Sequence, residues 1–162
     1  MTQRVSPAIV QLSALALWLG AAGFFSTAVA PALFATLPTR SLAGAVVGRL
    51  LPSVFYSGIV IGVLVIAIEV TLQRRWTWSG RSVAGAVMIG ACAAAQLFVA
   101  PRIDRIRSGI SGPVEELAVD DARRIAFGRL HGVSVAWLGL AMLAAVIAMV
   151  LAARTLQSRS TS

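Results

Sequence analysis

The residues of this chain that could do chemistry are few, and most of them lie together near residue 130. His131 is the only histidine, with Arg129 two residues before it and Ser134 three residues after it. An imidazole can titrate near neutral pH, exchange a hydrogen bond or ligate a metal. A further arginine lies near the start of another apolar segment. These residues form a candidate polar site of Arg49, Arg129, His131 and Ser134.

The sequence does not indicate a metal site or a catalytic site of a familiar kind. Zinc needs three or four suitable ligands, whereas the single histidine and the single cysteine, Cys92, lie in different apolar segments. No G-x-S-x-G, phosphate-binding glycine loop or H-E-x-x-H pattern occurs. We therefore expect no enzyme activity, no metal and no cofactor. For His131, a structural hydrogen bond and a functional role both stay open.

One acidic residue, Glu69, also lies inside an apolar segment, where a charge is costly. It stands close to Arg74 and Arg75 in the sequence, and we expect an ion pair with them at the membrane surface. About 30 Å of helix, at 1.5 Å per residue, would separate Glu69 from Arg49. These two residues therefore cannot pair with each other.

The elements that position these residues are long apolar runs. Hydrophobic residues make up 58% of the 162 residues and charged residues 12%, against about 25% charged in ordinary globular chains. A helix needs about 20 apolar residues to cross a bilayer. The sequence therefore predicts one all-α integral membrane domain over residues 1–162. It is a bundle of four transmembrane helices, with spans at about 8–30, 44–72, 82–100 and 130–153.

The polar connector at about 102–129 carries signals for a helix of its own. Pro113 suits a first helical turn, and the acidic Glu115 and Glu116 follow it at the positive end of the helix dipole. Two arginines come late in the segment. We expect a short amphipathic helix before the fourth span.

Small residues recur at the spacing that lets membrane helices pack closely. Three G-x-x-x-G pairs occur, and in lipid such pairs allow two backbones to approach each other. The predicted helix-packing residues are Gly44, Gly48, Gly58, Gly62, Gly128 and Gly132.

Two short sequences occur twice, which predicts an internal repeat of two tandem helical hairpins. Val29-Ala30-Pro31 returns as Val99-Ala100-Pro101, and Gly48-Arg49-Leu50 returns as Gly128-Arg129-Leu130. Four crossings place both termini on the same side of the membrane. Basic residues near span ends number six on one face and eight on the other, which does not decide the side.

The net charge of +8 comes from arginines near the ends of the apolar runs, where they suit lipid phosphates. We expect the lipid bilayer as partner and not nucleic acid, with other membrane subunits or further copies of the chain as alternatives. The first apolar run is longer than the core of a secretory signal, and Pro31 follows its Ala-Val-Ala triplet. We expect it to be retained as a helix.

Longer segments resemble a known family. Ala30-Pro31-Ala32-Leu33-Phe34, Leu51 to Gly58 and Phe127 to Ser134 look like bacterial membrane proteins of unknown function. These proteins share a domain with eukaryotic transmembrane proteins associated with platinum-drug resistance. That domain is distantly similar to the membrane part of copper-resistance protein D. The resemblance implies a four-helix domain in the bacterial inner (cytoplasmic) membrane. His131 and Ser134 match its markers, whereas Trp137-Leu138-Gly139 stands where many relatives carry a polar residue.

Two functional hypotheses follow. In the first, the chain is a structural or accessory subunit that packs against other membrane helices or lipids. In the second, it is a small carrier or a metal- or toxic-ion homeostasis protein with a polar site near His131.

Overall fold

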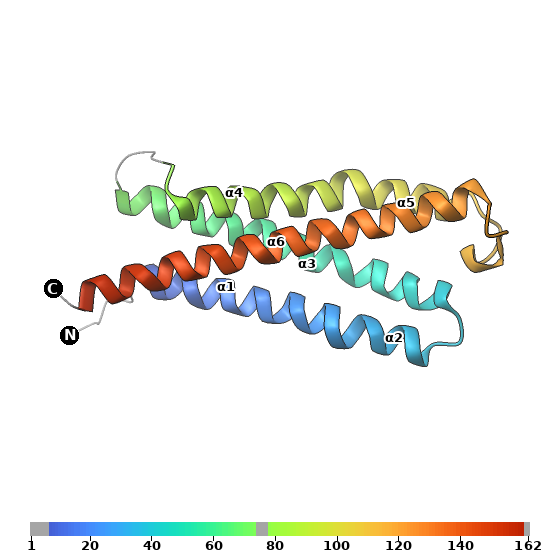
Figure 1. Ribbon diagram of the computed structural model, residues 1–162, viewed down its shortest axis with the longest axis horizontal. Coiled ribbons are helices and arrows are strands. Elements are labelled where there is room, and N and C mark those ends of the chain that lie inside the picture. Colours follow the sequence, from blue (N-terminus) through green and yellow to red (C-terminus); the bar gives the residue numbers. More distant parts are fainter. Residues whose placement is uncertain (1–6, 74–77, 161–162) are drawn as a thin grey trace.

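The chain folds into four long helices that run side by side, with no strand among residues 7–73 and 78–160, which are the residues that this computed structural model describes (Figure 1). Each helix is long and apolar enough to cross a membrane. The all-α four-helix membrane bundle predicted from the sequence is thereby confirmed, and the protein is an integral membrane protein. The elements are α1 (Pro7–Phe24), η1 (Phe25–Val29), α2 (Ala30–Thr36), α3 (Arg40–Gln73), α4 (Gly80–Ala93), η2 (Ala94–Val99), α5 (Ala100–Ser108), η3 (Val114–Glu116) and α6 (Ala122–Ser160).

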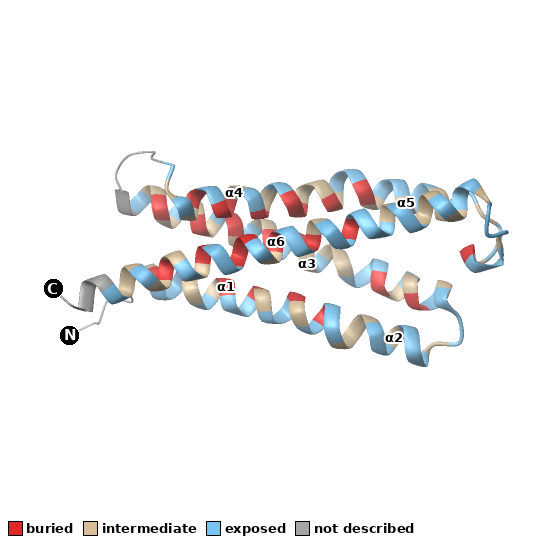
Figure 2. Ribbon diagram, viewed as in Figure 1, coloured by how far each residue is buried: buried red, intermediate tan, exposed pale blue. Residues whose placement is uncertain are grey.

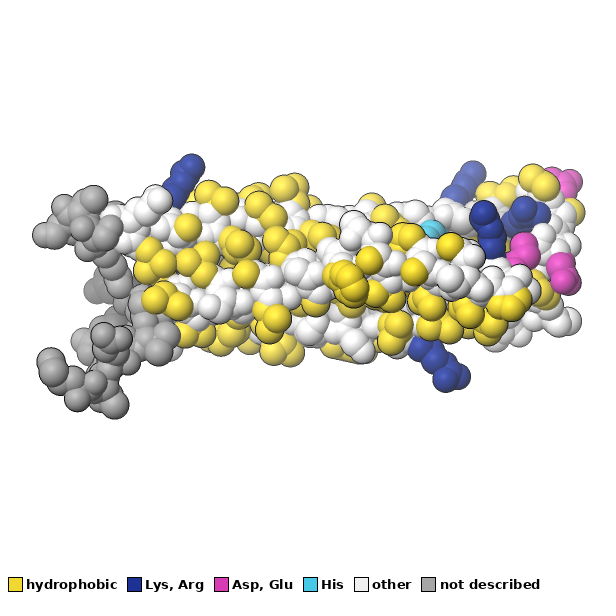
Figure 3. Space-filling view, turned by 90° about the horizontal axis from the view of Figure 1, so that it is seen from below, with side chains coloured by type: hydrophobic (Ala, Val, Ile, Leu, Met, Phe, Trp, Pro, Cys, Tyr) yellow, Lys and Arg dark blue, Asp and Glu magenta, His cyan; other side chains and the backbone are white. Residues whose placement is uncertain are grey.

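The four crossings consist of α1–η1–α2, α3, α4–η2–α5 and α6. The start of α1 and the end of α6 lie at one end of the bundle, which we call the termini end (Figure 1). The α2–α3 turn and the segment between α5 and α6 lie at the other end, which we call the connector end (Figure 1). Apolar side chains cover much of the visible surface between the ends, while most arginines and acidic residues stand near the ends (Figure 3). This distribution suits contact with a lipid bilayer.

Two of the crossings widen into a π-helical segment just before a proline. In the first, the N–H of Ala30 bonds the carbonyl of Phe25, and Pro31 follows. In the third, the N–H of Ala100 bonds the carbonyl of Ala95, and Pro101 follows. A proline cannot donate and crowds the preceding turn, and a wider turn relieves this. The two Val-Ala-Pro sequences thus have the same local structure, while the internal repeat itself stays a prediction.

The core occupies the middle and the termini half of the bundle, where α4 packs on α3 and α6, and α1 packs on α3 and α6. Gly58 and Gly62 make the α3 contacts possible: a Cβ on Gly58 would lie 2.7 Å from Cys92 Sγ, and one on Gly62 would lie 3.0 Å from the Gly85 carbonyl oxygen. No side chain larger than hydrogen fits at these positions without a shift. Gly58 and Gly62 therefore lie at close contacts between helices of this chain.

The other predicted packing glycines lie elsewhere. A Cβ on Gly44 would meet an arginine side chain, Arg107, and not a helix backbone. Gly128 and Gly132 have no atom within 4 Å of the position a Cβ would take. Neither pair brings two helices of this chain together, and packing of Gly128 and Gly132 against another molecule stays a prediction.

The connector differs from its prediction. In place of a separate amphipathic helix there is only the single turn η3, and α6 begins directly at Ala122. Asp121 caps α6, because its carboxylate accepts the Arg123 N–H at 2.8 Å. The Arg124 guanidinium bonds the carbonyls of Glu115 and Leu117, at 3.3 and 2.7 Å. Leu117 has extended backbone after η3, and no helix forms between η3 and the Asp121 cap.

Burial falls toward the connector end. Neither α2 nor α5 has a buried residue, whereas α4 has six. Figure 2 shows most buried positions away from that end, with a few on α3 and on the connector at that end. The helices are least tightly packed where the connector meets them, and this is where the pocket lies.

Candidate functional site

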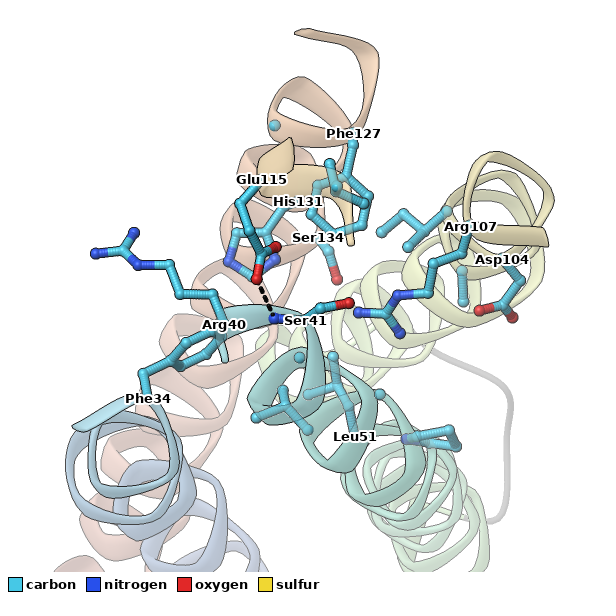
Figure 4. A pocket seen from close by; sticks show the side chains of 18 of the residues that line it. Phe34, Arg40, Ser41, Leu51, Asp104, Arg107, Glu115, Phe127, His131 and Ser134 are labelled. Carbon is cyan, nitrogen blue, oxygen red and sulfur yellow. Dashed lines mark hydrogen bonds between the residues drawn. The ribbon is translucent and has the colours of Figure 1, made fainter. Parts of the chain in front are cut away.

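A pocket of about 610 Å³ opens at the connector end, between α2, α3, α5, α6 and η3 (Figure 4). This volume lies within the range of small-molecule sites. Its inner wall is apolar and includes the buried Phe55, and its outer part is polar. The charged and polar lining residues are Arg40, Ser41, Gln96, Asp104, Arg107, Glu115, Arg124, His131 and Ser134. Apolar depth with a few convergent polar groups is the usual character of a ligand site.

The connector forms part of the pocket wall and is held there by specific bonds. Glu115 Oε1 accepts the backbone N–H of Ser41 at 2.9 Å, at the start of α3 (Figure 4). Arg124 fixes the same segment from α6 through its bonds to Glu115 and Leu117. The interactions of Glu115 and Arg124 are therefore structural.

Arg107 is the unusual residue of the pocket. Its guanidinium lies over the Phe127 ring, 5.7 Å from the ring centroid, and the absence of side chains at Gly44 and Gly48 leaves room for it. The side chain is half-buried, and within the described parts of the chain no carboxylate lies at ion-pair distance from it. A guanidinium carries five donors in a fork that matches carboxylate and phosphate. Arg107 is thus placed to receive an anion.

The pocket takes in two of the four candidate site residues. His131 and Ser134 line it, with the Ser134 hydroxyl near its buried end (Figure 4). Arg49 and Arg129 are exposed and do not line it. The structure therefore divides the predicted cluster, because neighbours in the sequence of a helix point in different directions.

Sequence reasoning missed Arg107 and the other residues that α5 brings to the pocket. It placed residues 102–108 in a polar connector, although the helix continues through Pro101 to Ser108. The available signal was the spacing of Gln96, Ile103, Asp104 and Arg107, which share one helix face only if the helix continues.

A second polar cluster lies at the termini end and joins all four crossings. Glu69 is 1% exposed, and its carboxylate bonds Gln11 at 3.1 Å and forms an ion pair with Arg81 at 3.1 Å. Arg81 also reaches Thr155 of α6. We call Gln11, Glu69, Ser79, Arg81, Ser82 and Thr155 the termini-end cluster.

This cluster changes the interpretation of Glu69. The ion pair that the structure describes is with Arg81 and is largely buried. The expected surface pair with Arg74 and Arg75 lies outside the described residues and stays a prediction. Both oxygens of the carboxylate have a donor, since Gln11 and Arg81 donate to Oε1 and the Ser79 hydroxyl donates to Oε2 at 3.1 Å. The cluster is a cross-link between helices.

A family model described as "Domain of unknown function (DUF4149)" matches residues 13–110, more than half of the chain. The chain belongs to this family. None of the curated proteins and none of the solved structures that were compared matches it. The DUF4149 match extends from α1 to the segment just after α5, so it includes Arg107 and the glycines beside it but not His131 or Ser134. The family description states no activity. The links to platinum- and copper-resistance proteins stay expectations from the resemblance.

Proposed function

We propose that this DUF4149 protein is a non-catalytic membrane protein that binds an anionic molecule in the connector-end pocket. The single observation that carries the proposal is Arg107, a half-buried guanidinium that faces a pocket and has no carboxylate at ion-pair distance within the described residues. A partly buried charge that has an aromatic ring beside it but no counter-ion is costly. A bound anion would remove that cost.

The charge of the pocket supports an anion over a cation. Three arginines line it against two carboxylates, Asp104 and Glu115. Glu115 already accepts a hydrogen bond from Ser41, and Arg124 already donates to two carbonyls. This leaves Arg40 and Arg107 against Asp104. Within the described residues no group of three or more histidine, cysteine or acidic side chains is placed to hold a metal ion. A carboxylate or a phosphate suits this lining better than a metal.

The proposal is tested with dodecyl phosphate as the probe and with the protein in phosphatidylcholine nanodiscs. Hydrogen bonds to a charged group contribute about 1.5–3 kcal/mol, so Arg107→Gln should weaken binding about ten- to a hundredfold. Arg105→Gln is the matched control, because Arg105 is exposed on the same helix and does not line the pocket. Equal affinities in the wild type and Arg107→Gln would exclude this function.

A role as an accessory subunit is the second candidate, and it follows from glycines on the outer surface. Gly20, Gly90 and Gly139 belong to three different crossings, are exposed, and have no atom within 4 Å of the position a Cβ would take. Such surfaces favour close approach by another membrane helix. Purification from native membranes in mild detergent tests this candidate, and a second protein in fixed stoichiometry would support it.

A carrier for a metal or another toxic ion receives less support. The pocket ends at Phe55, and a core of Leu15, Trp18, Met88 and Leu138 lies between it and the termini-end cluster. A carrier needs polar groups along its path. In the described core the Trp18 indole N–H already donates to the Val54 carbonyl, and the other core side chains are apolar apart from the Cys92 thiol.

A further inference from the structure

The source of the anion can be inferred from the side of the pocket that lies between α2 and α6. Near the middle of the bundle α6 faces α1, since Met142 Cε lies 3.9 Å from the position of a Cβ on Gly23. His131 stands about three helical turns before Met142, and so on the same edge of α6. At the level of His131 the first crossing has become α2, which packs on α3 and η1 but not closely on α6. The pocket therefore occupies the space that opens between α2 and α6.

Residues of α2 and α3 border this space on one side, and residues of α6 border it on the other. Phe34 of α2 and Arg40 of α3 line the pocket on one side, and His131 of α6 lines it on the other (Figure 4). Gly128 of α6 also lines the pocket. Phe34, His131 and Gly128 are all exposed, although each borders the pocket. Because they belong to segments that carry the apolar crossings, this side of the pocket faces the region that lipid occupies.

The surface of α6 beyond the pocket is flat and open. Gly128 lines the pocket, Gly132 follows one turn later, and neither has an atom within 4 Å of where a Cβ would lie. Ala136 continues the small, exposed residues by a further turn. An extended hydrocarbon chain can lie along such a surface without displacing a side chain.

We infer that the anion is the headgroup of a membrane amphiphile that enters sideways from the bilayer between α2 and α6. This inference rests on the proposed function. The phosphate or carboxylate lies against Arg107, the first part of the chain contacts Phe34, Phe55 and Phe127 in the pocket, and the rest follows Gly128 and Gly132 into the lipid. A water-soluble anion would use Arg107 but would leave the apolar lining and the glycine surface without a role.

Two probes with the same headgroup separate the two sources of the anion. Binding of dodecyl phosphate and of ethyl phosphate is measured on the protein in phosphatidylcholine nanodiscs, with empty nanodiscs subtracted. The variants are Arg107→Gln, Gly128→Leu and a control, Gly90→Leu, whose site on α4 is exposed and equally open. A leucine at position 128 extends into open space, so the fold tolerates it.

We expect dodecyl phosphate to bind about tenfold more tightly than ethyl phosphate, because burial of each methylene is favourable. Gly128→Leu should weaken the binding of dodecyl phosphate about tenfold, because the leucine crowds the hydrocarbon chain and such overpacking costs about 1.4 kcal/mol. The affinity for ethyl phosphate should not change. Gly90→Leu should change neither affinity.

Two outcomes overturn the inference in different ways. If both probes bind with equal affinity, and if Arg107→Gln weakens this binding while Gly128→Leu does not, the ligand is a soluble anion and the proposed function stands. If neither probe depends on Arg107, the proposed function fails as well.

Discussion

At the scale of single residues, the ion pair of Glu69 and Arg81 is a largely buried polar contact inside the bundle. The two atoms, Oε1 and Nε, are 3.1 Å apart, and the side chains are 1% and 16% exposed. Gln11 and Ser79 bond the same carboxylate. Buried ion pairs often add little to stability over apolar residues, but removal of one partner leaves the other charge uncompensated.

Glu69→Gln should therefore destabilise the fold although it keeps the shape of the side chain. We expect a loss of about 3 kcal/mol in the free energy of unfolding, measured by titration with a denaturing detergent. The double variant Glu69→Gln with Arg81→Gln should regain part of this loss, because no unpaired charge remains. A loss below about 1 kcal/mol would mean that solvent screens the pair, as at a surface.

The cap of α6 predicts a pH dependence outside the membrane. The side-chain hydrogen bond from Arg123 lowers the pKa of Asp121 from 3.8 to about 2. A carboxyl whose pKa is lower in the folded state stabilises the fold above its unfolded pKa, and this contribution is lost as the pH falls through the folded value. The contribution of Asp121 should thus be complete above pH 3.8 and disappear toward pH 2.

Two measurements check this prediction. NMR titration should give a midpoint near pH 2 for the Asp121 carboxyl, and Arg123→Ala should move it toward 3.8. The stability difference between the wild type and Asp121→Asn should be present at neutral pH and shrink as the pH falls below 3.8. A difference that stays constant over this range would show that the ionised carboxylate does not stabilise the cap.

At the scale of helices, glycines with the same sequence spacing have three different surroundings. Gly58 and Gly62 touch a neighbouring helix, Gly44 and Gly48 leave room for Arg107, and Gly128 and Gly132 face open space. The spacing places each pair on one face of a helix but does not say what lies opposite. What lies opposite each pair depends on how the four helices pack, and a local sequence pattern does not predict this packing.

The difference can be measured by adding one methyl group. In Gly62→Ala the new Cβ would lie 2.6 Å from Ile89 Cγ1 and 3.0 Å from the Gly85 carbonyl oxygen. We expect a net loss of about 1–3 kcal/mol from overpacking, even though alanine favours the helix by about 1 kcal/mol. Gly90→Ala, in open space, should be neutral or stabilising. Equal effects of the two substitutions in detergent unfolding would contradict the α3–α4 contact.

The connector between α5 and α6 is where sequence reasoning about the elements fell short. Pro113, Glu115 and Glu116 have the composition of a first helical turn, yet only one turn forms there. The Glu115 carboxylate bonds Ser41, 74 residues away, and Arg124 takes the carbonyls of Glu115 and Leu117. Contacts between distant residues override local preference in this segment.

At the scale of the whole molecule, the two ends of the bundle are built differently. The termini end is cross-linked by a cluster that joins all four crossings, and the connector end holds a pocket between helices with no buried residue in α2 or α5. The number of crossings and their approximate bounds follow from the apolar runs, since the cost of bare backbone in lipid allows little else. The position and lining of the pocket do not follow from the apolar runs, because its walls come from separate segments that only packing brings together.

This difference predicts how hydrogen exchange is distributed along the chain. Local opening is easiest where few apolar contacts are buried. The amides of α5 and of residues 109–121 should exchange faster than those of the first turns of α4, which lie at the opposite end and include the buried Ser82 and Ala84. Mass spectrometry of the protein in phosphatidylcholine nanodiscs measures both regions at once.

A ligand in the pocket should then stabilise one end selectively. At about 100 times its dissociation constant, a ligand that binds only the closed form adds about 2.7 kcal/mol to the opening free energy. Dodecyl phosphate should therefore slow exchange in α5, the connector and the first turns of α3 and α6, and leave the start of α4 unchanged. In Arg107→Gln the same concentration should protect neither end. Equal protection of both ends in the wild type would show that the probe acts through the surrounding bilayer, because a ligand held at Arg107 contacts the connector end alone.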